Sequence, residues 1–416
     1  MSRAILLVAY FYPPCRDTGA LRPASMAKWL RRLGHRVIVL TTSAYGAGGD
    51  EEAVRTADAQ RWRARLHGRD RIDALYDSDT YAGRPHPLSR LIVPEPLALA
   101  WAPFARHRAL RLRRERDFDC VITTSPPESA HGVGMALARR GVPWVADVRD
   151  AWTFEPLRPE FPTAAQRRLD RRLERRWLAA ADVVACVSAP AAEDLRARGI
   201  AEPLLIRNGW DPEPAATDGH TPTGLLDPAR TSLVYTGRFG SYGRDPRPLI
   251  DALARLAHDE PGAAARLELV VAGPLTAEEA RLLATDVSPA RIVAVGSLER
   301  ERALALQREA DALLLLAQAT RSQLLNIKLF EYLAAGRPIL ALAGDTEAGR
   351  VVERIGGETV RADDVAAIAA ALARLAAGRL EAPAADAVAP FTYPAPAARM
   401  AEAVELAITR RRPGAT

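Results

Sequence analysis

A lysine and a glutamate stand three positions apart in the stretch QLLNIKLFEYLAAGRPIL, residues 323–340. The pattern predicts a helix that ends near Gly336 and Pro338 and leads into a buried strand. Glu331 suits the early turns of such a helix, whereas Lys328 is opposed by the positive end of the helix dipole. The lysine therefore indicates a negative group nearby. The alternative is a solvated Lys–Glu pair on an exposed helix face.

Two arginines six positions apart, Arg238 and Arg244, enclose a glycine-containing loop in YTGRFGSYGRDP. Two guanidinium groups held by one short loop suit the several oxygens of a diphosphate. Together with Lys328 they would neutralise phosphate, and the Glu331 carboxylate would accept hydrogen bonds from two adjacent hydroxyls, as a ribose presents. These residues predict a nucleoside diphosphate ligand. The alternative for the arginines is a pair of surface side chains flanking a turn.

Further polar residues follow predicted strands in the first half of the chain. Gly19 lies in the loop FYPPCRDTGALRP, where a small residue lets backbone N–H groups approach an anion or a sugar hydroxyl, or simply makes a tight turn. His131 ends the motif TTSPPESAH and is either a functional or a satisfied histidine. Charged residues at a strand's end need partners and often face substrate. The motif VRDAW and the residue before it supply four more candidates: Asp147, Arg149, Asp150 and Trp152.

No pattern in the chain predicts a metal cofactor. Two Asp-x-Asp pairs occur, Asp77 with Asp79 and Asp117 with Asp119. The first lies in a stretch without regular pattern, and the second leads into the amino end of a strand, away from the end where ligands bind. No Cys/His spacing resembles a zinc ligand set, and there is no G-x-x-x-x-G-K-[ST] loop.

Six motifs occur in an order and at a spacing similar to those of the GT-B glycosyltransferases of family 4: FYPP…TGALRP, TTSPPESAH, ADVRDAW, RNGWD, VYTGRFGSYGRDP and IKLFEYLAAGRPIL. The chain resembles this family from about residue 4 to residue 405. The resemblance implies two Rossmann-like domains facing a cleft, with a nucleotide sugar held mainly by the second and an acceptor mainly by the first. It also implies metal-independent transfer with retention of anomeric configuration.

The same resemblance assigns roles to individual residues. Arg238 and Arg244 would take the donor phosphates and stabilise charge during catalysis, and Glu331 would bind the ribose. The remaining donor-binding residues would be Gly19, Gln323, Leu325, Asn326 and Lys328. The other catalytic residues would be His131, Asp147 and Asp150, and the acceptor-binding residues would be Arg22, Arg149 and Trp152. Contacts to the base are expected in VAVGSLERERAL, residues 293–304, which does not indicate the base.

One departure from the family pattern bears on the donor. The family has two glutamates eight positions apart, and the position eight before Glu331 is Gln323, followed by Leu324, Leu325 and Asn326 in place of the usual glycine-rich neighbours. A neutral amide can bind a sugar hydroxyl but cannot act as a base, so Gln323 is expected to bind and not to catalyse. The identity of the donor sugar stays open.

The elements that must position these residues form an α/β pattern. Short apolar runs alternate with helical patterns along the whole chain, which predicts βαβ units and doubly wound parallel sheets. The expected strands of the first half are 4–10, 36–42, 119–125, 143–148, 182–188 and 203–208. Those of the second half are 232–237, 266–273, 291–297, 311–317 and 338–344.

This alternation predicts four segments, and the family resemblance assigns the acceptor to the first domain and the nucleotide sugar to the second. Residues 1–207 form an acceptor-binding Rossmann-like domain, and 208–228, rich in Pro, Gly, Asp and Thr, form the linker. Residues 229–388 form the nucleotide-sugar-binding domain, and 389–416 form a proline-broken crossing and a helix that returns toward the first domain. Residues 45–95 show little period, and short helices are expected near 51–66 and 69–76.

Length and charge limit the classes of function. A chain of 416 residues predicts two domains, and its net charge of +6 is concentrated in arginine clusters at 106–117, 167–176 and 409–413. These are solvated faces or surfaces for an anionic membrane or an acidic substrate. Nucleic acid is not an expected partner, because no aromatic residues interleave with the arginines as a stacking platform requires.

The location expected from the sequence is the cytoplasm, with contact at the inner face of the membrane through the arginine clusters. Three widely spaced cysteines, two of them inside apolar runs, predict buried thiols in a reducing compartment. The apolar run near the N-terminus is short and lacks a cleavage site, so it predicts a strand. No apolar run approaches 18 residues.

The predicted activity is a hexosyltransferase acting on a glycan, a lipid-linked saccharide or a natural product. Two alternatives share the architecture. A nucleotide-sugar epimerase would form an epimer without an acceptor, and a non-catalytic binding protein would hold nucleotide sugar without turnover.

Overall fold

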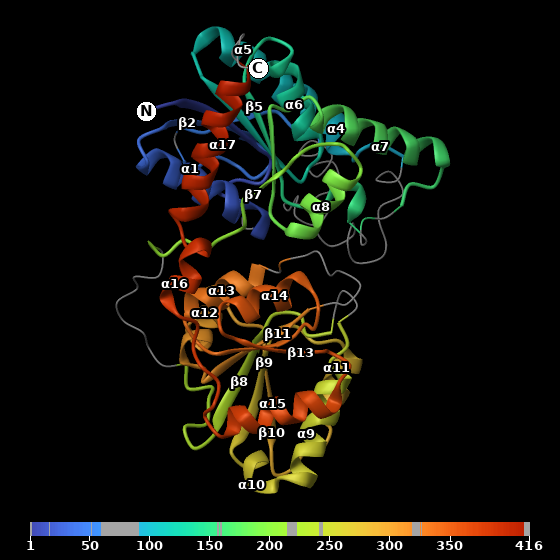
Figure 1. Ribbon diagram of the computed structural model, residues 1–416, viewed down its shortest axis with the longest axis vertical. Helices are drawn as coiled ribbons and strands as arrows, with labels where there is room; N and C mark the ends of the chain where they lie inside the picture. The colour runs from blue at the N-terminus through green and yellow to red at the C-terminus, as the bar shows by residue number, and fades with distance from the viewer. Residues whose placement is uncertain are drawn as a thin grey trace. The chain divides into compact units, whose positions relative to one another are not determined.

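The computed structural model describes residues 2–15, 17–50, 52–59, 91–155, 158, 160–213, 223–240, 244–317, 325 and 327–411. The chain forms two compact units (Figure 1). The first consists of Met1–Gly209 together with Tyr393–Thr416, and the second of Trp210–Thr392. Each unit is a parallel sheet with helices on both faces, so the predicted α/β fold class with two doubly wound parallel sheets is confirmed.

The described residues of the first unit contain a seven-stranded parallel sheet in the order β3-β2-β1-β4-β5-β6-β7. The strands are β1 (Ala4–Ala9), β2 (Arg36–Thr42), β3 (Val54–Thr56), β4 (Cys120–Ser125), β5 (Trp144–Val148), β6 (Val183–Cys186) and β7 (Leu204–Leu205). In the centre, Leu6 of β1 pairs with Ile38 on one side and Val121 on the other. The central strands are covered on both faces, which explains their unbroken apolar runs.

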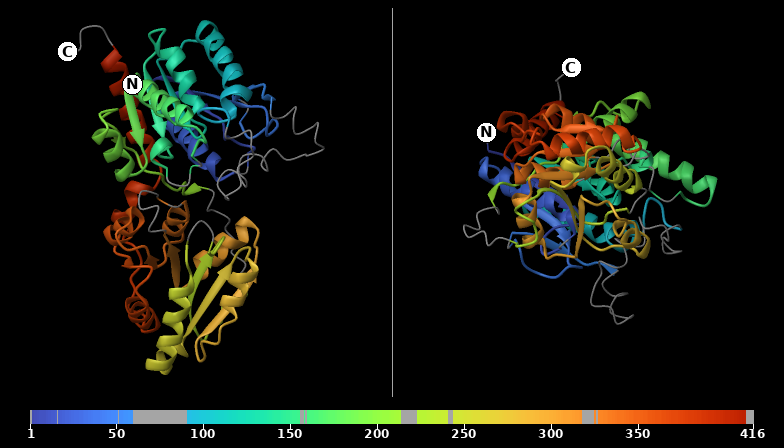
Figure 2. Two further views of the ribbon diagram at one scale, coloured as in Figure 1. Left: turned by 90° about the vertical axis from the view of Figure 1, so that its right-hand side faces the viewer. Right: turned by 90° about the horizontal axis from the view of Figure 1, so that it is seen from below.

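Helices cover both faces of this sheet because alternate strand residues point to opposite sides. One face packs against α5 (Ala102–Glu115), α6 (Ser129–Ala138) and α8 (Ala189–Ala197). The other packs against α1 (Leu21–Arg32) and α17 (Ala395–Arg411). The left view of Figure 2 shows the red helix α17 beside the elements of this unit. The remaining helical segments are η1 (Thr18–Ala20), α4 (Leu97–Ala100), η3 (Trp152–Phe154) and α7 (Ala164–Leu178).

The described residues of the second unit contain a six-stranded parallel sheet in the order β10-β9-β8-β11-β12-β13. Its strands are β8 (Thr231–Thr236), β9 (Leu267–Ala272), β10 (Arg291–Gly296), β11 (Ala312–Leu316), β12 (Ile339–Leu342) and β13 (Glu358–Val360). One face is covered by α9 (Arg247–Asp259), α10 (Pro261–Ala264), α11 (Ala277–Leu283) and α15 (Val365–Ala376). The other is covered by α12 (Arg300–Glu309), α13 (Ile327–Ala335), α14 (Glu347–Arg354), α16 (Ala385–Val388) and η6 (Ala389–Phe391).

Two segments of the chain connect the units, one before Trp210 and one after Thr392. They are hydrogen-bonded to each other where they enter the second unit. The Trp210 backbone N–H donates to the Phe391 carbonyl over 2.9 Å, and Trp210 forms a bridge with Thr392. Of the segment expected as a linker, 214–222 lies outside the described residues, and Leu225 and Leu226 pack against the core of the second unit. The second unit therefore begins at Trp210.

The structure corrects one expectation and adds two strands. Residues 54–56 form β3 and not part of a helix over 51–66, because Leu40, Thr41 and Thr42 of β2 offer an open edge for pairing. The helix expected near 69–76 lies outside the described residues. Strand β13 was not predicted. Among the described helices, none has the length and apolar character that crossing a bilayer requires.

Candidate functional site

The strand order identifies where each unit would bind a ligand. In both sheets the order reverses beside the first strand, between β1 and β4 and between β8 and β11. Ligands of doubly wound sheets bind outside the carboxyl ends of the strands at this reversal. The relevant segments are therefore the loop after β1 that leads to Gly19, and the loop after β8 that carries Arg238 and Arg244.

In the second unit, a lysine from α13 reaches the end of β8. The Lys328 Nζ lies over the ring of Tyr235, 5.6 Å from its centroid. Gly237, directly after β8, has a φ of 104°, and a Cβ atom there would lie only 2.1 Å from the Lys328 Nζ. A glycine is thus needed at this position for the backbone conformation and for the room that the ammonium group occupies.

The surroundings of Lys328 carry positive potential. Burial, together with the nearby charges of Arg244 and Arg300, lowers the pKa of Lys328 to about 8 against the opposing effect of Glu331. Arg244 also faces Glu279, whose pKa stays low despite burial because Thr276, Gly240 and Arg244 stabilise its charge. Two cations that disfavour each other's charge indicate a place for an anion. Lys328 and Arg244 thus lie close enough to affect each other's charge, and their binding of a phosphate stays a prediction.

Arg238 occupies the same loop with an exposed side chain, while its carbonyl accepts a hydrogen bond from the Tyr235 hydroxyl at 2.6 Å. Residues 241–243 between the two arginines lie outside the described part of the chain. The backbone of Arg238 is fixed by Tyr235. Its role toward a phosphate stays a prediction.

Glu331 lies on α13, half-buried, and pairs with Arg300 at the start of α12. The Arg300 Nη1 and the Glu331 Oε1 are 3.0 Å apart, and the arginine side chain is 55% exposed against 17% for the glutamate. An exposed arginine can move away when a ligand offers hydroxyls to the carboxylate. Arg300 was not singled out from the sequence. The signal for it was its place in 293–304, where base contacts were expected.

Three further donor-binding candidates stand before or at the start of α13. Gln323 and Asn326 lie outside the described residues. Leu325 is buried in the core of the second unit, so its side chain does not face a ligand. An apolar side chain beside Leu329 and Phe330 gains more from burial than from contact with a polar sugar.

In the first unit, Arg22 and Asp147 form a buried ion pair, which corrects the expected roles of both. Arg22 donates to the two oxygens of Asp147 at 3.0 and 2.7 Å. Its other N–H groups donate to the Ile206 and Arg207 carbonyls and to Asn208. All five guanidinium N–H groups are thus engaged, which leaves none for an acceptor.

The Asp147 carboxylate is likewise fully engaged within the protein. Burial alone would raise its pKa, but Arg22, Arg149 and the Thr124 hydroxyl hold the pKa below its usual range. A buried carboxylate that accepts three hydrogen bonds is a poor base. The pair fixes the end of β5 to α1 instead of contacting substrate.

The loop at Gly19 is held by its own hydrogen bonds. The Gly19 N–H donates to Asp17 Oδ1 at 2.6 Å, and its carbonyl accepts from Arg149 Nη1 at 2.5 Å. Arg149 also donates to the carbonyls of Ser125 and Pro126. It therefore ties the loop after β1 to the loop after β4, across the point where the strand order reverses. Asp17, which the sequence reading missed, occupies the N–H group that was expected to bind an anion.

His131 is completely buried on α6 and is held by Thr123. The Trp144 Nε1–H donates to the Thr123 hydroxyl oxygen at 2.8 Å, and this hydroxyl lies 2.8 Å from His131 Nδ1. If the hydroxyl donates to Nδ1, the ring proton lies on Nε2. Nε2 has no partner among the described residues. Burial lowers the pKa of His131 to about 4, so the ring is neutral near pH 7.

Trp152 is buried as well, which contradicts its expected contact with an acceptor. Its ring stacks on His131 at 6.1 Å between centroids, and its Nε1–H donates to Asp170 at 3.0 Å. The left-handed φ of 37° turns this side chain into the core. Asp150 is half-buried in the same segment, and its role stays a prediction. The described residues hold no group of three or more His, Cys, Asp or Glu placed to bind a metal ion.

Family models match most of the chain. Residues 19–209 match the glycosyl transferase 4-like domain, and residues 230–378 match the glycosyl transferases group 1 domain. No curated protein matches the sequence significantly.

Solved structures match nearly the full length. Sucrose-phosphate synthase from Thermosynechococcus elongatus has 17% identity and a TM-score of 0.60, covering 97% of this chain and 98% of its own. A UDP-forming α,α-trehalose-phosphate synthase from Burkholderia xenovorans, in complex with glucose-6-phosphate, has 12% identity and a TM-score of 0.61, covering 97% and 100%. A glycosyltransferase from Rickettsia africae has 15% identity and a TM-score of 0.59, covering 98% and 99%.

Proposed function

Because the chain belongs to the group 1 glycosyltransferases and has the GT-B fold, we propose that it transfers a sugar from a nucleoside diphosphate donor, held by the second unit, to an acceptor held by the first. The observation that carries the proposal is the meeting of Lys328 and Arg244 beside Tyr235 at the end of β8. A UDP-forming relative of similar fold supports a diphosphate in this role.

The proposed chemistry is electrostatic. As the bond between sugar and diphosphate breaks, negative charge grows on the departing oxygen, and fixed cations stabilise that charge more in the transition state than in the ground state. Lys328, Arg244 and Arg238 supply these cations, so the reaction is proposed to need no metal. Glu331 binds the ribose hydroxyls after Arg300 yields its place.

In the first unit, His131 is buried in the free protein, and its Nε2, which has no partner among the described residues, is the proposed donor to a hydroxyl of the transferred sugar once a local rearrangement exposes it. A neutral imidazole protonated on Nε2 can donate this hydrogen bond without acting as an acid or a base at pH 7. Retention of the anomeric configuration is proposed from the family resemblance, and proton NMR of the product anomer tests it. An inverted product would require a general base, for which the half-buried Asp150 is the candidate.

The proposed acceptor is a glycan, a lipid-linked saccharide or a natural product, and the proposed compartment is the cytoplasm. The three cysteines that predicted a reducing compartment are buried in the first unit. A lipid-linked acceptor would require contact with a membrane surface through arginine-rich segments of the chain.

The test begins with nucleotides. A ligand that binds only the folded state raises the melting temperature with concentration, so diphosphates should stabilise the protein more than monophosphates. The base that gives the largest shift identifies the donor, and release of diphosphate from that donor then measures turnover. Formation of an epimer without acceptor would favour the epimerase alternative, and binding without turnover would favour a binding protein.

The arginine variants test the placement of the diphosphate. Arg244→Ala should lower turnover by about a hundredfold, the scale of one preorganised electrostatic contact, and Arg244→Lys should restore most of it. Arg255→Ala on α9, which removes an exposed arginine paired with Asp259, is the matched control and should leave turnover unchanged. Normal turnover of both Arg238→Ala and Arg244→Ala with saturating substrates would reject the assignment.

A further inference from the structure

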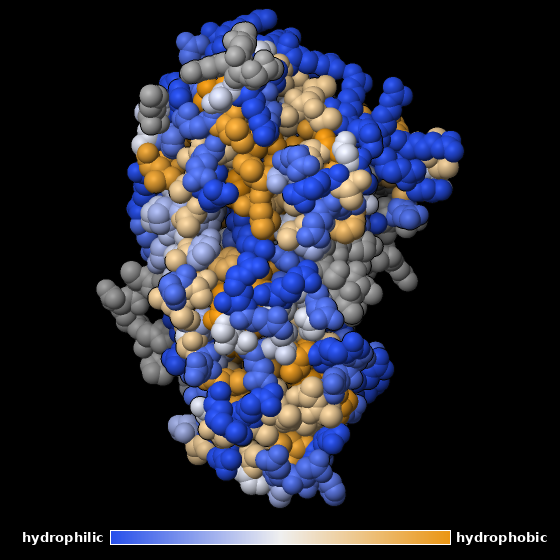
Figure 3. Space-filling view, in the orientation of Figure 1, coloured by the Kyte–Doolittle hydropathy of each residue, from blue (hydrophilic) through white to orange (hydrophobic). Residues whose placement is uncertain are grey.

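Helix α7 presents a continuous arginine face to solvent. Successive residues of a helix are rotated by about 100°, which places the exposed arginines of α7 within an arc of roughly 140°. These arginines are Arg168, Arg171, Arg172, Arg175 and Arg176. None of them forms an ion pair among the described residues. In Figure 3 the surface over α7, at the upper right, is mainly hydrophilic.

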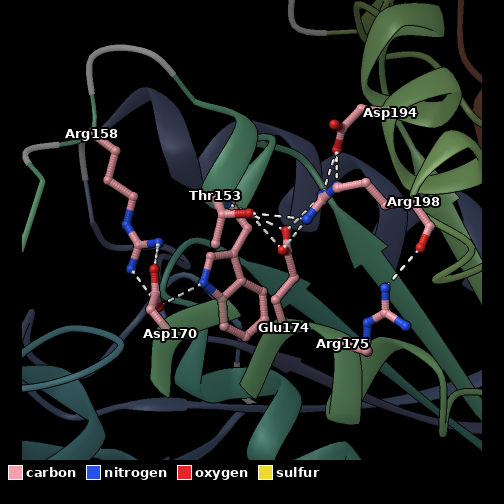
Figure 4. A network of polar contacts seen from close by, with 8 residues as sticks. Thr153, Arg158, Asp170, Glu174, Arg175, Asp194 and Arg198 are labelled. Carbon is pink, nitrogen blue, oxygen red and sulfur yellow. Dashed lines mark hydrogen bonds and ion pairs between the residues drawn. The ribbon is translucent and has the colours of Figure 1, made fainter. Parts of the chain in front are cut away.

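The acidic residues of α7 do not neutralise this face, because they point into the unit. Asp170 pairs with Arg158 at 2.7 Å and accepts from the Trp152 indole. Glu174, one turn later, pairs with Arg198 at 2.6 Å and is 1% exposed. Figure 4 shows both carboxylates turned toward these inner partners. The two carboxylates therefore pair inside the protein and do not neutralise the arginines of α7. The outer face of the helix keeps its positive charge.

Helix α5, the other arginine-rich helix of this unit, is different. Its arginines are partly neutralised at the surface, because Arg108 and Arg111 pair with Glu115, and Arg113 pairs with Asp117. The two helices are similarly rich in arginine. They differ in whether their carboxylates point to the surface or into the protein.

We propose that the outer face of α7 docks the protein onto an anionic lipid surface. Basic residues near such a surface each contribute to binding, and a helix can lie along it with apolar side chains in the headgroup region. Leu169 lies at the edge of the arginine face and is 46% exposed, which supplies such an apolar contact. The docking would bring the transferase proposed above to a lipid-linked acceptor, but it does not depend on the donor site.

A lipid surface fits this face better than the competing polyanions. The exposed arc of α7 carries arginines, Leu169 and alanines and no aromatic side chain on which a nucleic acid base could stack. Specific binding of an acidic protein partner requires pockets, or arginines fixed in a geometry that matches its carboxylates. The arginines of α7 instead project from one convex helix. Binding to a layer of lipid phosphates requires only positive charges on side chains long enough to reach it.

Co-sedimentation of the full chain with vesicles tests the proposal. The protein should bind vesicles of phosphatidylcholine and phosphatidylglycerol, should not bind vesicles of phosphatidylcholine alone, and should dissociate as salt rises. The triple variant Arg168→Gln, Arg171→Gln, Arg172→Gln should lose about a hundredfold in partition, or about fivefold for each arginine. These side chains are exposed, so its melting temperature and nucleotide affinity should match those of the parent.

The matched control removes the same charge from α5 and the residue that follows it. The variant Arg106→Gln, Arg114→Gln, Arg116→Gln changes three exposed arginines that form no ion pair among the described residues, and it should lose threefold or less. A fluorescent label tests which helix contacts the membrane. Because the native cysteines are buried, Leu169→Cys can be labelled selectively with an environment-sensitive fluorophore, which should shift to the blue on anionic vesicles. The same label at Phe104→Cys on α5 should not shift.

Three results would overturn the proposal. The first is absence of binding to anionic vesicles at low salt. The second is an equal loss from the α5 and α7 triples, which would mean that net charge alone acts. The third is binding to RNA or polyglutamate that is equally tight and equally sensitive to the α7 triple. None of these results bears on nucleotide binding, so failure of the docking and failure of the proposed transferase remain distinguishable.

Discussion

At the scale of single residues, Lys328 makes donor binding depend on pH. Burial lowers its pKa to about 8 in the free protein, and a bound phosphate favours the charged form and raises this pKa. Affinity for a nucleoside diphosphate should therefore be constant below pH 8 and fall above it, by up to about tenfold per pH unit. Calorimetric titration with the preferred diphosphate from about pH 7 to about pH 10 measures the effect.

Two variants isolate this lysine. Lys328→Met should bind weakly at every pH, since no charge titrates. Lys328→Arg should lack the loss above pH 8, because a guanidinium stays protonated. If the parent protein shows constant affinity through pH 10, the phosphate is not bound beside Lys328.

Glu331 is predicted to recognise the ribose and not the phosphates. Glu331→Ala should weaken binding of a nucleoside diphosphate by about 2 to 4 kcal/mol, because a charged acceptor of two hydroxyls is lost. Its pair with the exposed Arg300 contributes little to folding, so the melting temperature should change little. Inorganic pyrophosphate, which has no ribose, should bind parent and variant equally in calorimetry. Equal losses for both ligands would mean that Glu331 supports the phosphate site, for example by favouring the charge of Lys328, and does not recognise the ribose.

The residue scale is where sequence reasoning reaches its limit. The sequence predicted that Arg238 and Arg244 converge beside Lys328, and the structure places Lys328 within electrostatic reach of Arg244, while the binding role of all three stays a prediction. Arg22 and Trp152 were assigned to the acceptor from the same kind of position, yet both point inward. The partners that decide this, the carbonyls of Ile206 and Arg207 and the carboxylate of Asp170, lie far away in the sequence. No local pattern reports them.

At the scale of elements, the joint between β8 and α13 depends on Gly237. Gly237→Ala should destabilise the second unit by roughly 1–3 kcal/mol, because a φ of 104° strains any residue with a Cβ atom. The new methyl group would also displace the Lys328 ammonium from its place over Tyr235, so nucleotide affinity should fall together with stability.

Gly262→Ala is the control for Gly237→Ala. Gly262 lies in α10, and a Cβ atom there meets nothing within 4 Å. Alanine also favours a helix over glycine, so stability should hold or rise slightly. Thermal melts with and without nucleotide compare the two variants. Unchanged affinity in Gly237→Ala would show that Lys328 does not need this glycine.

Element prediction succeeded where apolar runs were long and failed where they were short. Strands such as β1 and β4 are buried on both faces, and their continuous apolar residues identify them. Strands β3 and β13 have only three residues each, VRT and ETV, with a charged residue in both. They exist because a neighbouring strand, β2 or β12, offers an edge for pairing, which is a tertiary cause.

At the scale of the whole molecule, the two units differ in how the chain builds them. The second unit is one continuous segment, Trp210–Thr392, whereas the first is completed by residues from Tyr393 onward. Helix α17 covers one face of the first sheet with buried side chains that include Met400 and Val404. The returning helix is thus part of the first unit's core.

Ending the chain at Thr392 should therefore unfold the first unit and spare the second. Loss of the buried side chains of α17 removes roughly 5 kcal/mol or more, at about 1.5–3 kcal/mol for each large apolar group. This approaches the whole stability of an ordinary domain. The bond from the Trp210 N–H to the Phe391 carbonyl remains, so the second unit keeps its closing contact.

Calorimetric melting with and without the preferred nucleoside diphosphate measures this outcome. The full chain should give a first-unit transition and a second-unit transition, of which the nucleotide raises the latter, because a ligand stabilises only the unit that binds it. The truncated chain should keep the nucleotide-sensitive transition and lose the other. A chain that ends at Arg411 is the control and should match the full chain, since it retains all of α17. Loss of the nucleotide-induced shift after truncation at Thr392 would mean that the donor site needs the first unit, against its assignment to Lys328, Arg244 and Glu331.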